Sequence, residues 1–298
     1  MKNILIIGCG LLGSSLLRRI QKKKMADKIY IYEKSKSNIT KIKKLKLPGI
    51  IIKKLEDGVV KADLIILCTP MNEYKNLILR MNKCLLSKTI ITDIGSSKIE
   101  SSKIIKKFLR KDISWTQSHP IAGSEVSGPE HGRQDIFEDK WCVLIKEKST
   151  KKNHLSILNK FWKKIGSKIV VMSPEKHDKI FSITSHLPHL IAYNLVKSAQ
   201  DFEKIQNYDL IKYSAGGLRD FSRIAASNEI MWRDIFFNNK NNISKAIDLF
   251  IKNLNSFKKD INSKNNKSIL KKLIQTKKVR TKIIKLKQDV NKPDFGRS

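Results

Sequence analysis

Short apolar runs alternate with stretches of helical spacing through the first third of the chain. One helical stretch, 34–47, is rich in lysine, and another, 74–85, is amphipathic. The apolar runs are rich in β-branched residues and lie at 2–7, 28–32, 49–52, 62–68 and 89–93. Near-continuous apolar runs are typical of strands that are buried on both faces. Because such strands alternate with helices here, the pattern predicts a right-handed, doubly wound parallel sheet.

The pattern changes after this region. Residues 118–128 are too rich in small and polar side chains for a sheet core, so we expect an active-site loop there. Apolar runs at 141–145 and 168–172 lie on either side of a helical stretch at 154–165. They predict two strands that extend the same sheet.

From Pro174 onward the spacing is helical, and Ser173 before it is typical of a helix N-cap. We therefore expect an α/β fold in which a Rossmann-type domain, residues 1–173, precedes an all-helical domain, residues 174–298. Residues 258–298 are lysine-rich and predict a helix followed by a basic, frayed tail. The helical domain also contains an amphipathic helix, predicted over residues 243–254.

Two groups of polar residues stand out in the helical half. Pro188 suits the first turn of a helix, which would place His189 near a helix N-terminus, where the dipole keeps an imidazole neutral. Arg219, Asp220 and Arg223 share one helical face, opposite an apolar one. Guanidinium groups on one face can bind carboxylates bidentately, although a solvated charged face has the same spacing.

A glycine-rich turn joins the first apolar run to the helix that follows it. Gly8, Gly10 and Gly13 stand in the order G-x-G-x-x-G, and with a strand before and a helix after, this is the dinucleotide-binding fingerprint. Gly8 permits a tight turn, Gly10 lets the backbone approach a pyrophosphate, and Gly13 lets the helix pack closely. Leu11 and Leu12 lie in the same turn and are expected to contact the cofactor. Helical spacing follows from Ser14, and the free N–H groups of that helix would face the phosphates.

Glu33 ends the second apolar run, about 20 residues beyond Gly13, where an acidic side chain accepts hydrogen bonds from the adenosine ribose. A carboxylate there repels a 2′-phosphate, so NAD is favoured over NADP as the cofactor. The run at 62–68 ends at Thr69 and Pro70, at the carboxyl edge where cofactors lie in open parallel sheets.

Composition narrows the class of protein further. The chain has 298 residues, of which 40% are hydrophobic, enough for about two globular domains. No stretch approaches the roughly twenty apolar residues of a membrane span. The four cysteines form no C-x-x-C pair and the six histidines lack metal-ligand spacing. We expect a cytoplasmic protein with reduced thiols and no metal site.

The formal net charge of +34 is the one unusual property of the composition. Taken alone, it would favour a polyanionic partner such as nucleic acid. The lysines are spread over the whole chain, however, and aromatic residues do not alternate with basic clusters as they do in single-strand binding. We therefore expect a solvated basic surface, no nucleic-acid partner, and a field that attracts small anions.

Four separated motifs resemble those of the prephenate and arogenate dehydrogenases, a family that makes tyrosine or its precursor. The first two are Gly8-Cys9-Gly10-Leu11-Leu12-Gly13-Ser14-Ser15 and Ser118-His119-Pro120-Ile121-Ala122-Gly123-Ser124-Glu125-Val126-Ser127-Gly128. The third is His177-Asp178 with Ser185-His186-Leu187-Pro188-His189, and the fourth runs from Gly217-Leu218-Arg219-Asp220-Phe221-Ser222-Arg223-Ile224-Ala225 through Met231-Trp232-Arg233-Asp234. The first is generic, but the other three in this order are specific. The resemblance implies NAD-dependent oxidation of a ring hydroxyl with loss of CO2, and a homodimer formed through the helical domain. It leaves the choice between prephenate and arogenate open.

The resemblance also implies roles for individual residues. His119 matches the family's catalytic histidine and would take the hydroxyl proton, a transfer that suits a near-neutral imidazole. Ser96 matches a serine that orients the hydroxyl and the histidine, although a turn-capping serine fits the same place. Arg223 matches the arginine that holds the ring carboxylate, and His189 would contact the substrate on the same side of the cleft.

Four further residues are assigned through the same resemblance. Asp220, Glu125 and His177 are expected to support or gate the site. Trp232 is expected to close over the substrate side chain, from the same subunit or from its partner. A place in the helix core explains Trp232 equally well.

Two other functions share parts of this pattern. A β-hydroxyacid dehydrogenase has a similar two-domain build, but it carries a catalytic lysine in the helical domain where this chain offers histidines and arginines. A basic nucleic-acid-binding protein with a Rossmann scaffold would account for the charge, and a steep salt dependence of duplex binding would reveal it.

Overall fold

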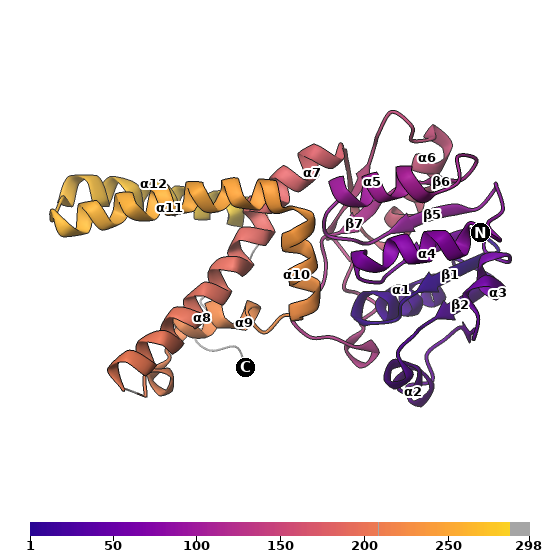
Figure 1. Ribbon diagram of the computed structural model, residues 1–298, viewed down its shortest axis with the longest axis horizontal. Helices are drawn as coiled ribbons and strands as arrows, with labels where there is room; N and C mark the ends of the chain where they lie inside the picture. Colours follow the sequence, from indigo (N-terminus) through magenta and orange to yellow (C-terminus); the bar gives the residue numbers. More distant parts are fainter. Residues whose placement is uncertain (208, 287–298) are drawn as a thin grey trace.

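The computed structural model describes residues 1–207 and 209–286, and its N-terminal half is built on a six-stranded parallel sheet (Figure 1). The strands are β1 (Asn3–Ile7), β2 (Lys28–Tyr32), β3 (Ile50–Ile51), β4 (Leu64–Leu67), β5 (Ile90–Asp93) and β6 (Ser114–Trp115). Their spatial order is β3-β2-β1-β4-β5-β6, so the direction of the strand order reverses between β1 and β4. This confirms the predicted doubly wound sheet, and its switch point is where ligands bind in open α/β folds.

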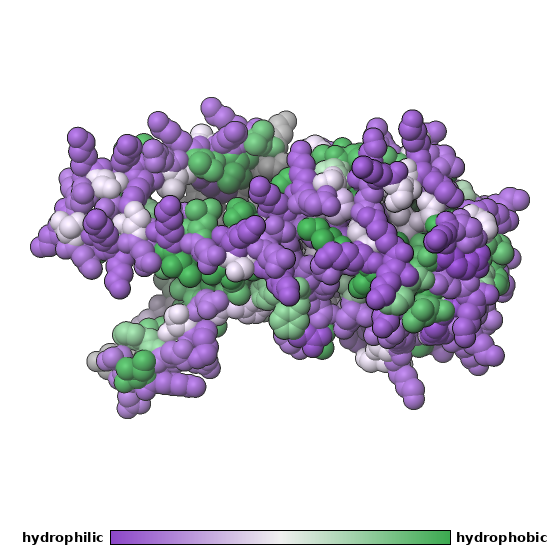
Figure 2. Space-filling model, turned by 45° about the horizontal axis from the view of Figure 1, so that its top comes forward, coloured by the Kyte–Doolittle hydropathy of each residue, from purple (hydrophilic) through white to green (hydrophobic). Residues whose placement is uncertain are grey.

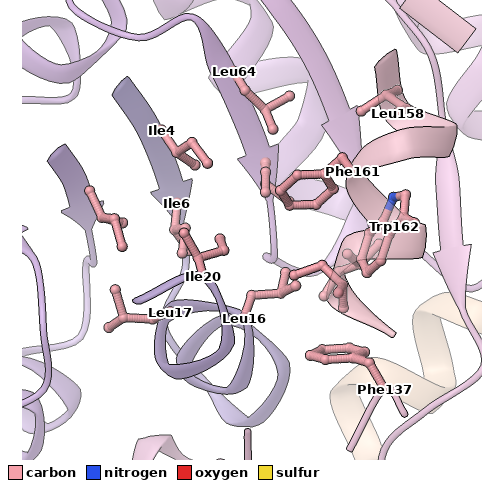
Figure 3. Close-up of a cluster of buried hydrophobic side chains, with 14 of the residues drawn as sticks. Ile4, Ile6, Leu16, Leu17, Ile20, Leu64, Phe137, Leu158, Phe161 and Trp162 are labelled. Atoms are coloured by element: carbon pink, nitrogen blue, oxygen red, sulfur yellow. The ribbon is translucent and has the colours of Figure 1, made fainter. Parts of the chain in front are cut away.

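Hydrophobic clusters cover both faces of this sheet. The helices of this half are α1 (Leu11–Lys22), α2 (Lys36–Lys44), α3 (Leu55–Val59), α4 (Tyr74–Met81) and α5 (Ile99–Phe108). Successive residues of β1 alternate between two clusters: Ile4 and Ile6 pack with α1, whereas Leu5 and Ile7 pack with α3 and α4. Figure 3 shows the first cluster. This burial on both faces explains why the strand reads as one continuous apolar run.

The prediction that the runs at 141–145 and 168–172 extend the main sheet is wrong. They form a second, three-stranded sheet, in which β8 is antiparallel to β7 and parallel to β9. Its elements are β7 (Ser118–Pro120), β8 (Trp141–Ile145), α6 (Lys152–Ile165) and β9 (Lys168–Met172). An apolar strand beside an amphipathic helix has the same pattern whichever sheet it joins. The first three residues of the predicted loop at 118–128 are therefore a strand of this sheet.

The second half of the chain is helical, as predicted (Figure 1). Its helices are α7 (Pro174–Phe181), α8 (Leu187–Gln206), α9 (Gly216–Ile224), α10 (Glu229–Asn238), α11 (Lys240–Asn262) and α12 (Asn266–Lys285). Ser173 caps α7, since its side chain accepts a hydrogen bond from the Lys176 N–H. The predicted frayed tail lies largely outside the described residues, at 287–298. Within the described ranges, no helix is long and apolar enough to cross a membrane.

Pro188 lies in the first turn of α8, so His189 is near the start of that helix as predicted, but this start is not a free N-terminus. A π-helical turn, η3 (Ser182–His186), joins α7 directly to α8, so His189 lies inside one helical run. Pro188 suggested a helix start because its ring crowds the preceding turn of a regular helix. We attribute its tolerance here to the wider π turn just before it. The dipole argument for a neutral His189 therefore does not apply.

Replacing Gly13 with alanine tests the close approach of α1 to the glycine turn. A Cβ at Gly13 would lie 2.1 Å from the Gly8 carbonyl oxygen. Alanine normally stabilises a helix by about 1 kcal/mol relative to glycine. Here we expect the free energy of unfolding to fall by about 1–3 kcal/mol, as in overpacked sites, in urea denaturation.

The matched control is Gly10→Ala, because none of the described atoms lies within 4 Å of a Cβ built there. Its free energy of unfolding should stay close to that of the unchanged protein. Equal losses in the two variants would contradict the steric explanation.

Candidate active site

The glycine turn lies at the switch point between β1 and β4. Gly8 has a φ of +87°, and a Cβ there would lie 2.8 Å from the Cys68 carbonyl oxygen. At Gly10, by contrast, no described atom would meet a Cβ within 4 Å. The buried Oγ1 of Thr69 has no hydrogen-bond partner among the described residues. An unpaired hydroxyl and open space beside the N-terminus of α1 fit the pyrophosphate of a dinucleotide.

Glu33 is held at the edge of this turn, just after β2. Its Oε2 accepts a hydrogen bond from the Cys9 N–H at 2.7 Å, and its Oε1 accepts one from the Ser35 N–H at 2.8 Å. Each carboxylate oxygen has a further lone pair, so Glu33 can also accept hydrogen bonds from ribose hydroxyls. Three more predicted cofactor residues are half-buried or exposed at the same carboxyl edge: Leu11, Leu12 and Pro70.

His119 lies on β7 and is hydrogen-bonded to the helical half of the chain. Its Nδ1 lies 2.8 Å from Nε2 of His177, and Nδ1 of His177 lies 2.8 Å from Oδ1 of Asp178. All three side chains are buried. The ring of Phe181 packs against both imidazoles, with centroids 5.0 Å from His119 and 4.5 Å from His177. This packing fixes both rings at the junction of the two halves.

A buried ion pair, absent from the sequence-based site, lies beside this chain of hydrogen bonds. Nζ of Lys98 donates to Oδ2 of Asp93 and to the Ser118 carbonyl oxygen, each at 2.7 Å, and both charged side chains are fully buried. Asp93 ends β5 and Ser118 begins β7, so the ion pair places His119 next to the main sheet. Lys98 was missed because lysine is so abundant in this chain that a single one carries no signal.

Burial keeps the histidines of this group neutral. Burial, with smaller contributions from His177, Lys98 and His186, lowers the pKa of His119 well below its ordinary value. Burial and the Lys98 charge do the same to the pKa of His177. The pKa of His186 falls to about 4, again mainly through burial. A neutral imidazole can accept a proton at neutral pH.

His189 and Trp232 form a stacked pair. Their ring centroids are 3.7 Å apart with an interplanar angle of 22°. Nδ1 of His189 lies 2.9 Å from the Ser185 carbonyl oxygen. Burial, aided by the nearby charge of Arg223, lowers the pKa of His189. Trp232 packs in the hydrophobic cluster of α3 and α4, so it is part of the protein core.

Arg223 and Glu125 meet although they are far apart in the chain. Nη1 of Arg223 on α9 lies 3.0 Å from Oε2 of Glu125, in the loop after β7. Both side chains are partly exposed. Asp220 instead lies beside Arg219 at 3.6 Å, and no described contact joins it to the histidine group. The predicted charged face of α9 therefore meets the His119 loop through Arg223.

Electrostatic neighbours connect these parts into one site. His186 lowers the pKa of His119, His189 lowers that of His186, and Arg223 lowers that of His189. Ser96, half-buried in the turn after β5, lies with its backbone against His186 and raises its pKa. The arrangement offers a buried imidazole at His119 and, near His189, the guanidinium of Arg223, a combination that suits proton abstraction from an anionic substrate.

Comparisons with known proteins identify the family. Residues 16–171 match the profile described as prephenate dehydrogenase, nucleotide-binding domain, and residues 173–276 match prephenate dehydrogenase, dimerization domain. The first match alone covers more than half of the chain. This chain belongs to the prephenate dehydrogenase family.

Individual relatives of this prephenate dehydrogenase family member agree with the profiles. The cyclohexadienyl dehydrogenase of Zymomonas mobilis is 33% identical over 279 residues, which are 94% of this chain and 95% of that protein. The structure of Aquifex aeolicus prephenate dehydrogenase in complex with hydroxyphenyl propionate and NAD+ is 34% identical, with a TM-score of 0.88 over 95% of this chain and 98% of that one. Synechocystis arogenate dehydrogenase, at 22% identity and a TM-score of 0.77 over 94% of this chain and 99% of that one, shows the fold alone.

The lowered pKa values of the buried histidines predict how stability depends on pH. The unfolded chain binds protons near the ordinary histidine pKa of 6.5, whereas folded His119, His177 and His186 do not. The free energy of unfolding should therefore fall between about pH 7.5 and about pH 5.5, by up to about 1.4 kcal/mol per pH unit for each proton. Urea denaturation at several pH values measures this slope.

Two variants assign the slope to buried groups. His186→Asn should reduce the slope of the free energy of unfolding with pH by the contribution of about one proton. His131→Gln should leave it unchanged, because 47% of the His131 side chain is exposed. A stability that does not change over this pH range would refute the prediction.

Proposed function

We propose that this protein is an NAD-dependent dehydrogenase that converts prephenate to 4-hydroxyphenylpyruvate and CO2, or arogenate to tyrosine and CO2. The observation that carries the proposal is a buried histidine, His119, held next to the carboxyl edge of the nucleotide-binding sheet by the Lys98–Asp93 pair. Membership of the prephenate dehydrogenase family supports the same reaction. No described feature favours a different dehydrogenase reaction.

The reaction requires a base and an anion-binding group at opposite ends of a ring. His119 takes the proton of the ring hydroxyl as that carbon is oxidised. NAD, when bound, supplies the acceptor for the hydride that leaves the same carbon. The resulting ketone draws the electron pair of the C–CO2 bond into the ring, so CO2 departs and the ring becomes aromatic. His119 then returns its proton to the ring oxygen, which leaves the base neutral again.

The proposal also assigns roles to several other residues predicted from the sequence. Arg223 holds the ring carboxylate: its Nη1 donates to Glu125, and a guanidinium has further donors that can bind a second carboxylate. Ser96 orients the hydroxyl. His189, stacked on Trp232, contacts the substrate on the Arg223 side. Asp220 is assigned a supporting role through its neighbour Arg219.

The cofactor site and the domain boundary complete the assignment. Glu33 favours NAD over NADP by accepting hydrogen bonds from the ribose hydroxyls. The pyrophosphate is assigned to the turn at Gly8, Gly10 and Gly13, with Leu11, Leu12, Thr69 and Pro70 around it. We place the domain boundary between residues 173 and 174, because β9 ends at Met172 and α7 begins at Pro174.

We assign a homodimer to the helical half of the chain. Residues 173–276 match a dimerization domain, and Figure 2 shows hydrophobic side chains gathered on the helical half of the molecule. On α11, Leu249, Leu254 and Ile261 are each more than half exposed.

The four cysteines are free, which supports a reducing compartment such as the cytoplasm.

An assay of NADH formation tests the function directly. The purified protein is given prephenate or arogenate with NAD or NADP, and we expect NADH from NAD with at least one substrate. Replacing His119 with asparagine should lower kcat by roughly 10²- to 10⁴-fold, the contribution of general-base catalysis, while NAD affinity stays unchanged. Unaltered turnover in this variant would remove His119 from the mechanism.

Replacing Arg223 with alanine tests the carboxylate site. We expect KM for the substrate to rise by roughly 10- to 100-fold, since a charge-assisted hydrogen bond contributes about 1.5–3 kcal/mol, with a smaller change in kcat. The matched control is Arg133→Ala: the Arg133 side chain is 72% exposed and its guanidinium pairs with Asp135 at 2.8 Å. An unchanged KM in Arg223→Ala would leave the ring carboxylate without its assigned partner.

A further inference from the structure

The hydrogen bonds behind His119 determine which of its ring nitrogens carries the hydrogen. We propose that His177 and Asp178 are positioning residues that hold neutral His119 in the tautomer with hydrogen on Nδ1, so that Nε2 is the atom that accepts the substrate proton. This inference rests on the proposed function only in giving His119 the role of base. The tautomer itself is a property of the protein without substrate.

The argument starts at Asp178. Its Oδ1 accepts the Lys98 N–H at 2.8 Å and its Oδ2 accepts the Ile99 N–H at 2.9 Å. Burial raises the pKa of Asp178, but these two hydrogen bonds and the Lys98 charge oppose that rise. Donors at both oxygens favour the ionised carboxylate, which has no hydrogen to give.

The tautomers of the two histidines follow in order. Because Asp178 can only accept, Nδ1 of His177 must carry a hydrogen and donate it across the 2.8 Å contact. Nε2 of neutral His177 then holds a lone pair. It can pair with Nδ1 of His119, also at 2.8 Å, only if that Nδ1 carries the hydrogen. Nε2 of His119 is left with the lone pair, which a base requires.

The surroundings hold the His119–His177–Asp178 hydrogen bonds in place. His177 and Asp178 are fully buried and lie next to each other on α7, and Phe181 packs against both imidazole rings. The charged or titratable groups that face the two histidines are Lys98, Asp178 and His186, and the Cys142 thiol lies against the His119 backbone. Lys98 is paired with Asp93, which leaves Asp178 as the carboxylate that His177 contacts.

The arrangement also supports the protonated state. When His119 takes a proton on Nε2, its Nδ1–H still donates to His177, and His177 still donates to Asp178. No hydrogen has to move and no new contact is needed. The Asp178 charge therefore stabilises the imidazolium through one intervening ring, as the aspartate does directly in a Ser-His-Asp triad.

Nitrogen NMR on the whole protein, labelled with ¹⁵N-histidine and free of substrate, tests the tautomer. The His119 signals are assigned by their loss in His119→Asn. We expect a protonated Nδ1 and an unprotonated Nε2 at neutral pH. A hydrogen on Nε2, or an even mixture of the two tautomers, would overturn the inference.

Two substitutions at His177 separate positioning from simple structural support. His177→Leu removes the acceptor, so His119 should become a mixture of tautomers and kcat should fall by roughly 10- to 100-fold, as for hydrogen-bond partners of ligating histidines, with KM for NAD unchanged. His177→Gln keeps an acceptor and a donor, so it should restore the Nδ1–H tautomer and much of kcat. Equal tautomer populations and equal kcat in the two variants would refute the positioning role.

The readouts distinguish this inference from the proposed function. An Nδ1–H tautomer in a protein that oxidises neither prephenate nor arogenate would refute the function and uphold the positioning role. Turnover of prephenate by a protein with hydrogen on His119 Nε2 would uphold the function and refute the positioning role. Circular dichroism of each variant confirms that it is folded.

Discussion

The carboxylate of Asp178 joins the two halves of the molecule at the first turn of α5. Helix N-termini leave their first N–H groups without partners inside the helix, and Lys98, the N-cap of α5, offers no side-chain cap. Asp178 accepts the N–H groups of Lys98 and Ile99 from the neighbouring helix α7. Each buried N–H left unpaired would cost about 1–3 kcal/mol. The nucleotide-binding half is therefore completed by an acceptor from the helical half, and the same acceptor orients His177.

The side chain of Lys98 makes the second connection, between the two sheets. A buried ion pair is costly to desolvate and persists when further hydrogen bonds satisfy its remaining groups. Here Asp93 also accepts from the Tyr74 hydroxyl at 2.9 Å and from the Trp115 indole at 3.2 Å, and Lys98 donates to the Ser118 carbonyl oxygen. The backbone N–H groups of Lys98 and Ile99 thus bind the helical half, and the side chain of Lys98 binds β7. His119 occupies the position next to Ser118, so both connections act on it.

Local patterns predicted the parts of the fold that depend on local physics. The strand-turn-helix around Gly8, the acidic residue Glu33 directly after β2 and the cap at Ser173 each follow a rule that holds within a few residues. The second sheet was not predictable in this way, because strand pairing is decided by partners distant in the chain. The π turn that joins α7 to α8 was not predictable either, since a proline permits several helical geometries. The structural roles of Lys98 and Asp178 could not be predicted either, because they depend on a contact between residues 80 positions apart in the sequence.

The π turn at Ser182–His186 carries a constraint on the length of the chain. It lies between His177 and Asp178 on one side and His189 on the other, within a helical run that has no loop to absorb a change. Each residue of a helix advances the direction of its side chain by about 100°. A π turn holds one residue more than an α turn, so loss of one residue would convert it to an α turn, whereas gain of one residue in this run would rotate His189 and all of α8 away from Trp232 while His177 kept its place. Insertions that surface loops tolerate should therefore be excluded from this segment, where the number of residues matters as much as their identity.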